Sequence, residues 1–429
     1  MKKKSLISLF TAINIVVANM IGTGVFTSLG FQVVDIKSGF ALLCLWLVGG
    51  IFALCGALCY GELGAAMPRS GGEFHYLSRI YHPAIGFLSG WVSATVGFAA
   101  PIAATAMALG EYLSKVFPAL MPTAIALVAV TAVSLIHTQN IKTGSYFQNV
   151  FTPLKVILIV SLVVCGFFLA QPQNINFLPT AGDFNVIFSS PFAVSLVFVM
   201  YSYSGWNASV YIASEVKNPQ KNVPRSLFMG TLIVIVLYVL LNFIFLYTTP
   251  IQDLAGKLDI GYVAAQRIFG PSGGQIMGLL ISLGLISSIS SMTWAGPRVM
   301  QVIGEDIPFF KVLATQNASG VPYYAILIQL AFVLVLIITS SFQSIITYLS
   351  FTLTLSSFIA VLGVFVHRFR YPSVPRPYKT WGYPVTPLIF LSISLWMLIY
   401  IFLDKPMESL AGLGTIFIGL LVYLVVSKK

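Results

Sequence analysis

Long apolar stretches separated by short polar or Pro/Gly-rich segments make up most of this chain. Each stretch is close to the ~20 residues that an α-helix needs to cross a bilayer. Twelve spans are predicted, near residues 6–32, 39–66, 84–111, 120–138, 147–170, 188–213, 224–248, 270–300, 322–340, 342–367, 383–403 and 408–427. The pattern predicts an all-α integral membrane protein whose 429 residues form a single transmembrane domain.

Composition excludes a water-soluble protein. Hydrophobic residues make up 58% of the chain and charged residues 8%, against roughly 25% charged residues in soluble domains. The four cysteines, Cys44, Cys55, Cys59 and Cys165, lie inside apolar stretches without the spacing of a disulfide framework or a zinc site. We therefore expect no metal and no cofactor. The basic N-terminus resembles a signal peptide, but its apolar stretch runs on to a glycine pair without a cleavage site.

The basic residues indicate how the chain is oriented. Loops on the cytoplasmic side of a membrane are enriched in Lys and Arg. One set of alternating loops carries 17 of them, namely Lys2, Lys3, Lys4, Arg69, Arg79, Lys142, Lys217, Lys221, Arg225, Arg298, Lys311, Arg368, Arg370, Arg376, Lys379, Lys428 and Lys429. The other set carries 5, which are Lys37, Lys115, Lys257, Arg267 and Lys405. Both termini are predicted to be cytoplasmic, in an inner (cell) membrane, and the net charge of +11 does not indicate nucleic acid binding.

Two of the predicted spans carry matching interruptions. The first contains Ile21-Gly22-Thr23-Gly24, and the sixth contains Tyr201-Ser202-Tyr203-Ser204-Gly205-Trp206-Asn207. Glycine weakens a helix by roughly 1 kcal/mol relative to alanine, although a glycine pair alone could equally be a close-packing patch. Because the interruptions are five spans apart, they predict inverted repeats over about 6–170 and 188–367, with 383–427 added.

Backbone groups freed at such interruptions suit an amino acid. The amides of Thr23 and Gly24 would begin a half-helix whose positive end meets a carboxylate. The carbonyls of Ile21, Tyr201 and Ser204 would accept hydrogen bonds from the ammonium group. Asn207 is expected to bind substrate, water or freed backbone, and Tyr201 either gates the site or packs like the other aromatic residues.

Lys155 is the one basic residue that belongs to neither set of loops, and it lies within the fifth predicted span. A lysine in mid-membrane costs about 2.5–3.5 kcal/mol on insertion scales, so it normally faces a cavity or a partner. It could instead extend its ammonium toward the cytoplasmic surface. Glu62, Glu111 and Glu408 lie near the ends of predicted spans, and no Asp or Glu lies in the middle of one. A cationic substrate would need a buried carboxylate. The predicted substrate is therefore a zwitterion with an uncharged side chain.

Three stretches resemble the amino acid/polyamine/organocation superfamily, and within it the L-type amino acid transporters. They are Ile21 to Phe26, Gly61 to Glu73, and Tyr203 to Asn207 with Glu215-Val216-Lys217-Asn218-Pro219 downstream. The resemblance implies a leucine-transporter-type fold of five-plus-five inverted repeats with unwound first and sixth helices. It also implies alternating access and sodium-independent exchange of neutral L-amino acids.

The resemblance further implies roles for single residues. Lys155 matches a helix-five lysine whose ammonium would stand where sodium binds in related coupled carriers, and Tyr238 matches a helix-seven tyrosine near it. Tyr201 stands where many relatives have phenylalanine, which adds a hydroxyl at the expected gate. Some relatives pair with a glycoprotein through a cysteine after helix three. The segment from Glu111 to Pro122 has no cysteine, so no disulfide-linked subunit is expected.

Some alternative functions are compatible with the same sequence features, and others are not. A proton-coupled symporter of this fold remains open because Lys155 could titrate if desolvated. A sensor that binds an amino acid without moving it is also open. A channel is disfavoured because no repeated filter segment is present. An enzyme is disfavoured because no carboxylate pair, metal set or nucleophile with a base lies at membrane depth.

Overall fold

A computed structural model describes residues 7–139 and 141–426, apart from the side chains of residues 141–148. Six of the basic residues used to predict the orientation lie outside the described part of the chain. They are Lys2, Lys3, Lys4, Lys428, Lys429 and, for its side chain, Lys142. The first half of the chain forms α1 (Leu9–Met20), α2 (Gly24–Asp35), α3 (Gly39–Ala66), α4 (Glu73–Ile80), α5 (Pro83–Val92), α6 (Ala99–Val116), α7 (Pro122–His137), α8 (Ile141–Leu169) and α9 (Asp183–Ile187).

The second half is helical as well. It forms α10 (Ser190–Tyr203), α11 (Ala208–Tyr211), α12 (Pro219–Thr248), α13 (Ile251–Leu254), α14 (Ile260–Asp306), α15 (Tyr323–Thr339), α16 (Phe342–Arg370), α17 (Val385–Asp404) and α18 (Pro406–Val426). A π-helical turn at Ser93–Gly97 joins α5 to α6, and 3-10 turns follow α11 at Ala213–Glu215 and α14 at Pro308–Ala314.

A helix occupies the position of every predicted span. Within the described ranges, nine helical segments are long and apolar enough to cross a membrane, and the shorter apolar helices α7, α10 and α15 lie at the other three positions. The segment predicted at 270–300 begins at a kink in α14, where Gly270 has a φ of 79°. An L side chain rarely adopts that backbone conformation, so glycine is required at the kink.

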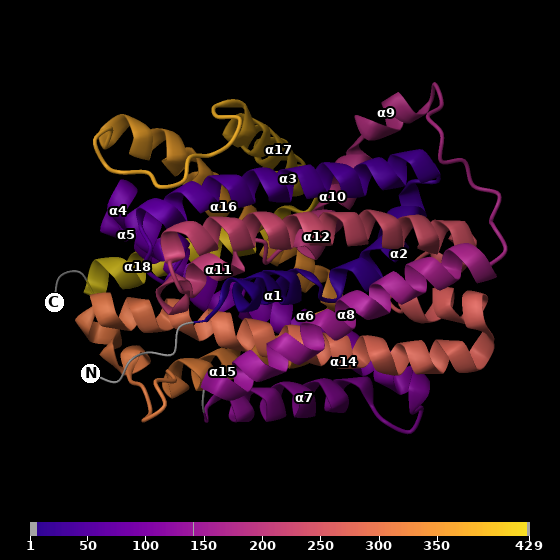
Figure 1. Cartoon of the computed structure of the whole chain (residues 1–429), viewed down its shortest axis with the longest axis horizontal. Helices are drawn as coiled ribbons and strands as arrows, with labels where there is room; N and C mark the ends of the chain where they lie inside the picture. The colour runs from indigo at the N-terminus through magenta and orange to yellow at the C-terminus, as the bar shows by residue number, and fades with distance from the viewer. Residues whose placement is uncertain (1–6, 140, 427–429) are drawn as a thin grey trace.

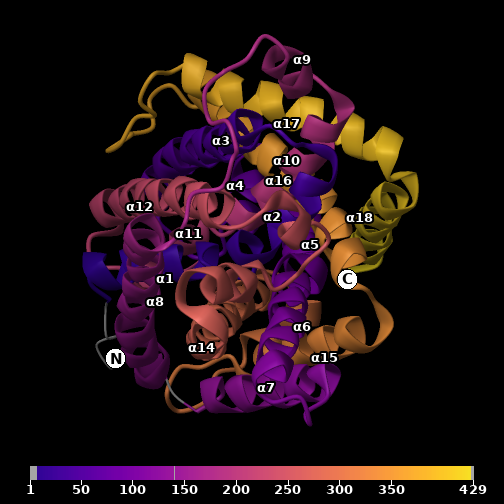
Figure 2. The same ribbon diagram turned by 90° about the vertical axis from the view of Figure 1, so that its right-hand side faces the viewer.

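The helices run roughly parallel to the long axis of the molecule (Figure 1). Seen end-on, α2, α10 and α11 lie near the middle of the bundle, and α7, α17 and α18 lie at its periphery (Figure 2). The α2 helix packs against α10, and α1 packs against α8, α12 and α14. The two interrupted helices are thus surrounded by other helices, where freed backbone groups are shielded from lipid.

Candidate functional site

Both predicted interruptions are present. The α1 helix ends at Met20 and α2 begins at Gly24. The α10 helix ends at Tyr203 and the four-residue α11 begins at Ala208. The first amides of a helix have no partner within that helix. The residue before α2, Thr23, makes no capping hydrogen bond with its side chain, so the N-terminus of α2 is not capped in the usual way.

The two breaks lie directly against each other. A Cβ atom placed on Gly24 would lie 2.4 Å from the Cα of Ser202, and one on Gly205 would lie 2.8 Å from the carbonyl carbon of Asn19. Gly205 also has a φ of 95°, which side chains rarely permit. Glycine is therefore needed at both positions. Gly24 lets the first break approach α10, and Gly205 lets the second break approach α1.

Lys155 of α8 donates hydrogen bonds to backbone carbonyls at the first break. Its side chain is 5% exposed. Its Nζ donates to the carbonyl of Ile21 at 2.8 Å, to the Oγ of Ser288 on α14 at 2.7 Å and to the carbonyl of Ala18 at 3.4 Å. Ser288 Oγ in turn donates to the carbonyl of Ile21 at 2.6 Å. The ammonium therefore faces α1 and α14 rather than a membrane surface, and the Ile21 carbonyl already accepts two hydrogen bonds.

Tyr238 of α12 contacts the same break. Its hydroxyl donates to the carbonyl of Met20, which also accepts from the amide of Gly22 at 2.8 Å. The side chain is fully buried. The carbonyls of the first break thus have partners from three different helices, α8, α12 and α14.

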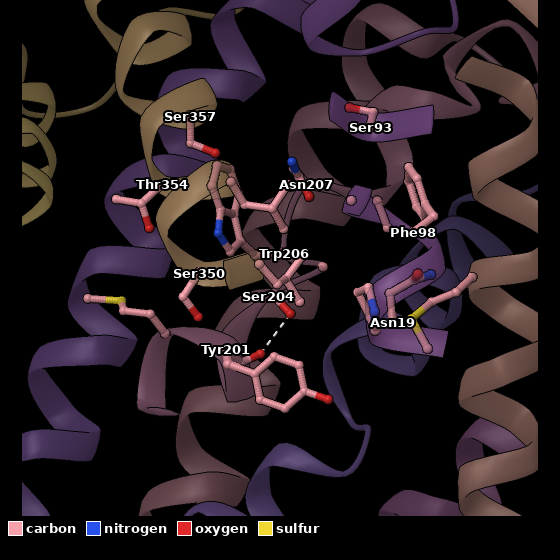
Figure 3. Close-up of a pocket in the computed structure, with 18 of the residues that line it drawn as sticks. Asn19, Ser93, Phe98, Tyr201, Ser204, Trp206, Asn207, Ser350, Thr354 and Ser357 are labelled. Atoms are coloured by element: carbon pink, nitrogen blue, oxygen red, sulfur yellow. Dashed lines mark hydrogen bonds between the residues drawn. The ribbon is translucent and has the colours of Figure 1, made fainter. Parts of the chain in front are cut away.

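The second break is closed by its own residues. The carbonyl of Tyr201 accepts from the amide of Ser204 at 3.0 Å and from the Ser204 hydroxyl at 2.7 Å (Figure 3). The carbonyl of Ser204 accepts no hydrogen bond within the part of the chain that the structure describes. Of the three carbonyls expected to meet an ammonium group, Ser204 is therefore the one with free capacity.

A hydroxyl contact joins the two breaks. The hydroxyls of Thr23 and Tyr201 lie 2.7 Å apart and share a hydrogen bond. The Tyr201 ring meets Phe342 of α16 edge-on, with ring centroids 6.4 Å apart. Where the resemblance leads one to expect phenylalanine, the extra hydroxyl is thus bound to the residue that precedes α2.

A cavity of about 90 Å³ opens beside the breaks. Its wall contains three of the predicted site residues, Tyr201, Ser204 and Asn207, together with Asn19 of α1, which the sequence did not single out. Ile21, Thr23 and Gly24 do not line it. Figure 3 shows Ser350, Thr354 and Ser357 on one side of the cavity, and Ser93, Phe98 and Asn19 on the other.

One expectation from the sequence is wrong, because a carboxylate does line this cavity. Glu73, the first residue of α4, is 3% exposed and belongs to the cavity wall. Its Oε1 accepts from the Tyr60 hydroxyl at 2.9 Å and from Asn207 Nδ2 at 2.8 Å. Burial raises the pKa of the Glu73 carboxyl above its ordinary value, and those hydrogen bonds oppose the rise.

The sequence held a signal for Glu73 in the two glycines before it. Gly71 and Gly72 both have positive φ, 109° and 53°, and they turn the chain back toward the bundle after α3. A count of carboxylates inside spans could not find Glu73, because it lies between two spans.

Ion pairs join segments at the end of the bundle predicted to be cytoplasmic. Arg69 pairs with Asp306 at 2.7 Å, which links the segment after α3 to the end of α14. Arg298 of α14 pairs with Glu215, after α11, at 3.0 Å. Both pairs connect α14 to a segment that follows α3 or α11. These segments are therefore held against α14 at this end of the bundle.

Comparisons with known proteins show the family to which the chain belongs. The family model described as "Amino acid permease" matches residues 7–426. The b(0,+)-type amino acid transporter 1 of Mus musculus is 28% identical over 429 residues, covering 97% of this chain and 87% of that protein. The large neutral amino acids transporter small subunit 2 of Mus musculus is 27% identical over 440 residues, covering 98% and 80%.

These relatives are transporters and not enzymes, in line with the absence of catalytic groups in the sequence. The resemblance drawn from the three sequence stretches is confirmed over nearly the whole length. The chain is similar to L-type amino acid transporters, and it belongs to the amino acid permease family.

Proposed function

We propose that the chain carries neutral L-amino acids across the cytoplasmic membrane by alternating access, without sodium, and that it works as an exchanger. The observation that carries the proposal is the pair of helix breaks packed on each other beside a cavity. Such breaks are the usual binding place in transporters built from inverted repeats. The ammonium binds the Ser204 carbonyl in the cavity wall, and the substrate carboxylate binds the amides at the start of α2, which become accessible when the two breaks move apart, because Thr23 and Gly24 do not line the cavity in this structure.

Lys155 supports sodium independence. Sodium binds to oxygen ligands, and the oxygens of Ile21, Ala18 and Ser288 converge on one point beside the first break. The Lys155 ammonium occupies that point and carries the positive charge a metal ion would bring. Lys155 and Tyr238 act as coupling residues, because each holds a carbonyl of the break that must rearrange as the site opens.

The packing of the helices supports a proposal for the transport cycle. We propose that twelve helices span the membrane as five-plus-five inverted repeats over about 6–170 and 188–367, with 383–427 added, and that both termini are cytoplasmic. Opening toward the cytoplasm then separates Arg69 from Asp306 and Arg298 from Glu215. Tyr201 acts as the gate on the cavity, since its hydroxyl leaves Thr23 when the breaks separate.

The decisive experiment is counterflow. The purified chain is reconstituted in liposomes preloaded with unlabelled alanine, serine or leucine, and entry of the same labelled amino acid is followed without an ion gradient. Trans-stimulated uptake that persists when choline replaces sodium is expected. Absence of uptake by folded protein, with substrate binding retained, would instead mean a sensor. Uptake by the purified chain alone also tests the expectation that no disulfide-linked subunit is needed.

Glu73 favours proton coupling as a second candidate. A buried carboxyl that lines the cavity and has a raised pKa is suited to exchange a proton during the cycle. An imposed inward proton gradient separates the two mechanisms. If uptake into empty liposomes rises with the gradient and is abolished by a protonophore, the symporter is correct; if uptake depends on internal amino acid alone, the exchanger is.

A further inference from the structure

The amide of Asn207 has a fixed orientation. Its Nδ2 donates to Glu73 Oε1 at 2.8 Å and to the Tyr211 hydroxyl at 3.0 Å, which uses both of its hydrogens. An ionised carboxylate only accepts hydrogen bonds, so the nitrogen and not the oxygen must face Glu73. The Asn207 Oδ1 accepts no hydrogen bond within the described residues, and in Figure 3 it lies on the side of Ser204.

Glu73 binds the amide nitrogen of Asn207 and so fixes the direction of the amide oxygen. The same Oε1 that binds Asn207 also accepts from Tyr60 of α3, so the carboxylate is fixed from two sides. Removing the acceptor at residue 73 would free one Nδ2 hydrogen and allow the amide to turn over. Glu73 is therefore a positioning residue for Asn207 and does not need to touch the substrate itself.

A second polar group in the cavity wall also lacks a partner. Ser350 of α16 is buried, and its Oγ has no hydrogen-bond partner in the described part of the chain. Buried hydroxyls are almost always hydrogen-bonded, so one that is not needs an explanation. Ser350 faces the same cavity as Asn207, and a polar ligand group there would satisfy it.

The cavity is small compared with pockets that bind drug-sized ligands. Its volume is about 90 Å³, whereas pockets for drug-sized ligands are roughly 300–1,000 Å³. The aromatic rings of Phe52, Phe98 and Trp206 enclose it. A substrate with a short side chain fits this space, whereas a long aliphatic or aromatic side chain would have to displace one of these rings.

We propose that this cavity selects small hydroxyl-bearing amino acids, serine and threonine, over apolar amino acids of the same shape, because Asn207 Oδ1 accepts a hydrogen bond from the substrate hydroxyl. Glu73 orients Asn207 for that contact. The proposal rests on the proposed transport function and names its substrate class. A site that hydrogen-bonds a substrate hydroxyl rejects the analogue without it, because its own polar group is then left unpaired.

The test compares threonine with valine, which have the same shape and differ in a hydroxyl against a methyl group. Both are used as competitors of labelled serine counterflow in proteoliposomes. We expect threonine to compete about 10-fold better than valine, the factor that corresponds to ~1.4 kcal/mol, and serine better than leucine. Equal competition by threonine and valine, or stronger competition by leucine or arginine, would overturn the proposal.

Two matched variants test the role of residue 73. Glu73→Gln keeps an acceptor for Asn207 and is expected to keep most of the threonine preference. Glu73→Met has a similar length without an acceptor, and its threonine-to-valine ratio is expected to fall toward one. An unchanged ratio in folded Glu73→Met overturns the positioning role. If Glu73→Met does not fold, Asn207→Leu tests the contact on which that role depends; its ratio is expected to fall toward one, and an unchanged ratio overturns the selectivity proposal.

The outcome separates this inference from the transport proposal. If no amino acid shows trans-stimulated uptake in the wild-type protein, the transport function fails. If uptake is present and threonine has no advantage over valine, transport stands and the selectivity proposal alone is wrong.

Discussion

The two helix breaks are held in different ways. In the first, the carbonyls of Met20 and Ile21 bind side chains from α8, α12 and α14. In the second, the Tyr201 carbonyl binds Ser204, three residues away, and the Ser204 carbonyl and Asn207 Oδ1 accept nothing within the described residues. The first break is therefore fixed by the surrounding bundle, while the second keeps free acceptors for a ligand.

This difference assigns separate tasks to the breaks. A backbone whose partners come from three helices moves only when those helices move, so the first break is suited to couple binding to the cycle. A break closed locally can change its ligand contacts without disturbing distant helices. We infer that selectivity resides at the second break and coupling at the first, with the α2 amides serving the common carboxylate.

The largest effect is expected where the breaks touch. In Gly24→Ala the new Cβ would lie 2.4 Å from the Cα of Ser202, whereas in Gly22→Ala the nearest atom is 3.9 Å away. Forcing atoms into a packed contact costs about 1–3 kcal/mol or more. Serine counterflow should fall to background in Gly24→Ala and stay within about twofold of wild type in Gly22→Ala. Equal activity of the two variants would show that the close approach is not required.

The next effect concerns the support of the first break. Lys155→Ala removes two short hydrogen bonds from a charged donor, each worth about 1.5–3 kcal/mol. If half of that energy acts in the cycle, exchange falls about 10- to 150-fold, and folding as judged by size-exclusion profile is retained. The matched control is Lys115→Ala at an exposed position on α6, which should exchange normally. Wild-type flux in Lys155→Ala contradicts the coupling role.

A smaller effect is expected at the contact between the breaks. Tyr201→Phe and Thr23→Val each remove one side of the shared hydrogen bond, and each should weaken serine exchange about 3- to 10-fold. Because the same bond is lost in both, the double variant should be little worse than either single one. Additive losses in this double-mutant cycle would mean that the two hydroxyls act independently.

The smallest effect concerns stability at the helix that carries Glu73. Burial, then Arg69 and Arg79, lower the pKa of His75 on α4 to about 4 from 6.5. The unfolded protein therefore binds a proton that the folded protein rejects, and stability falls as pH drops from about 6.5 toward 4. Between pH 7 and 5 the loss is about 1–2 kcal/mol. Melting curves of His75→Gln should depend less on pH than those of wild type or of the exposed His82→Gln control.

Sequence patterns predict the helices well because membrane spans need a fixed apolar length, whatever they pack against. They also predict the breaks, since glycines at Gly24 and Gly205 leave a local signature. They do not predict Glu73, because its burial depends on the turn at Gly71 and Gly72 and on its partners Tyr60 and Asn207. Nor do they indicate that the carbonyl of Ile21 is already occupied, since its partners Lys155 and Ser288 are brought to it by tertiary packing.

The most direct test of the account is an experimental structure of the chain in a lipid nanodisc with saturating serine. The account predicts the serine carboxylate at the amides of Thr23 and Gly24, the ammonium at the Ser204 carbonyl and the hydroxyl at Asn207 Oδ1, with Lys155 Nζ still bound to the Ile21 carbonyl. Serine bound away from both breaks, or Lys155 released from Ile21 to bind the substrate carboxylate, would contradict the division of tasks between the two breaks.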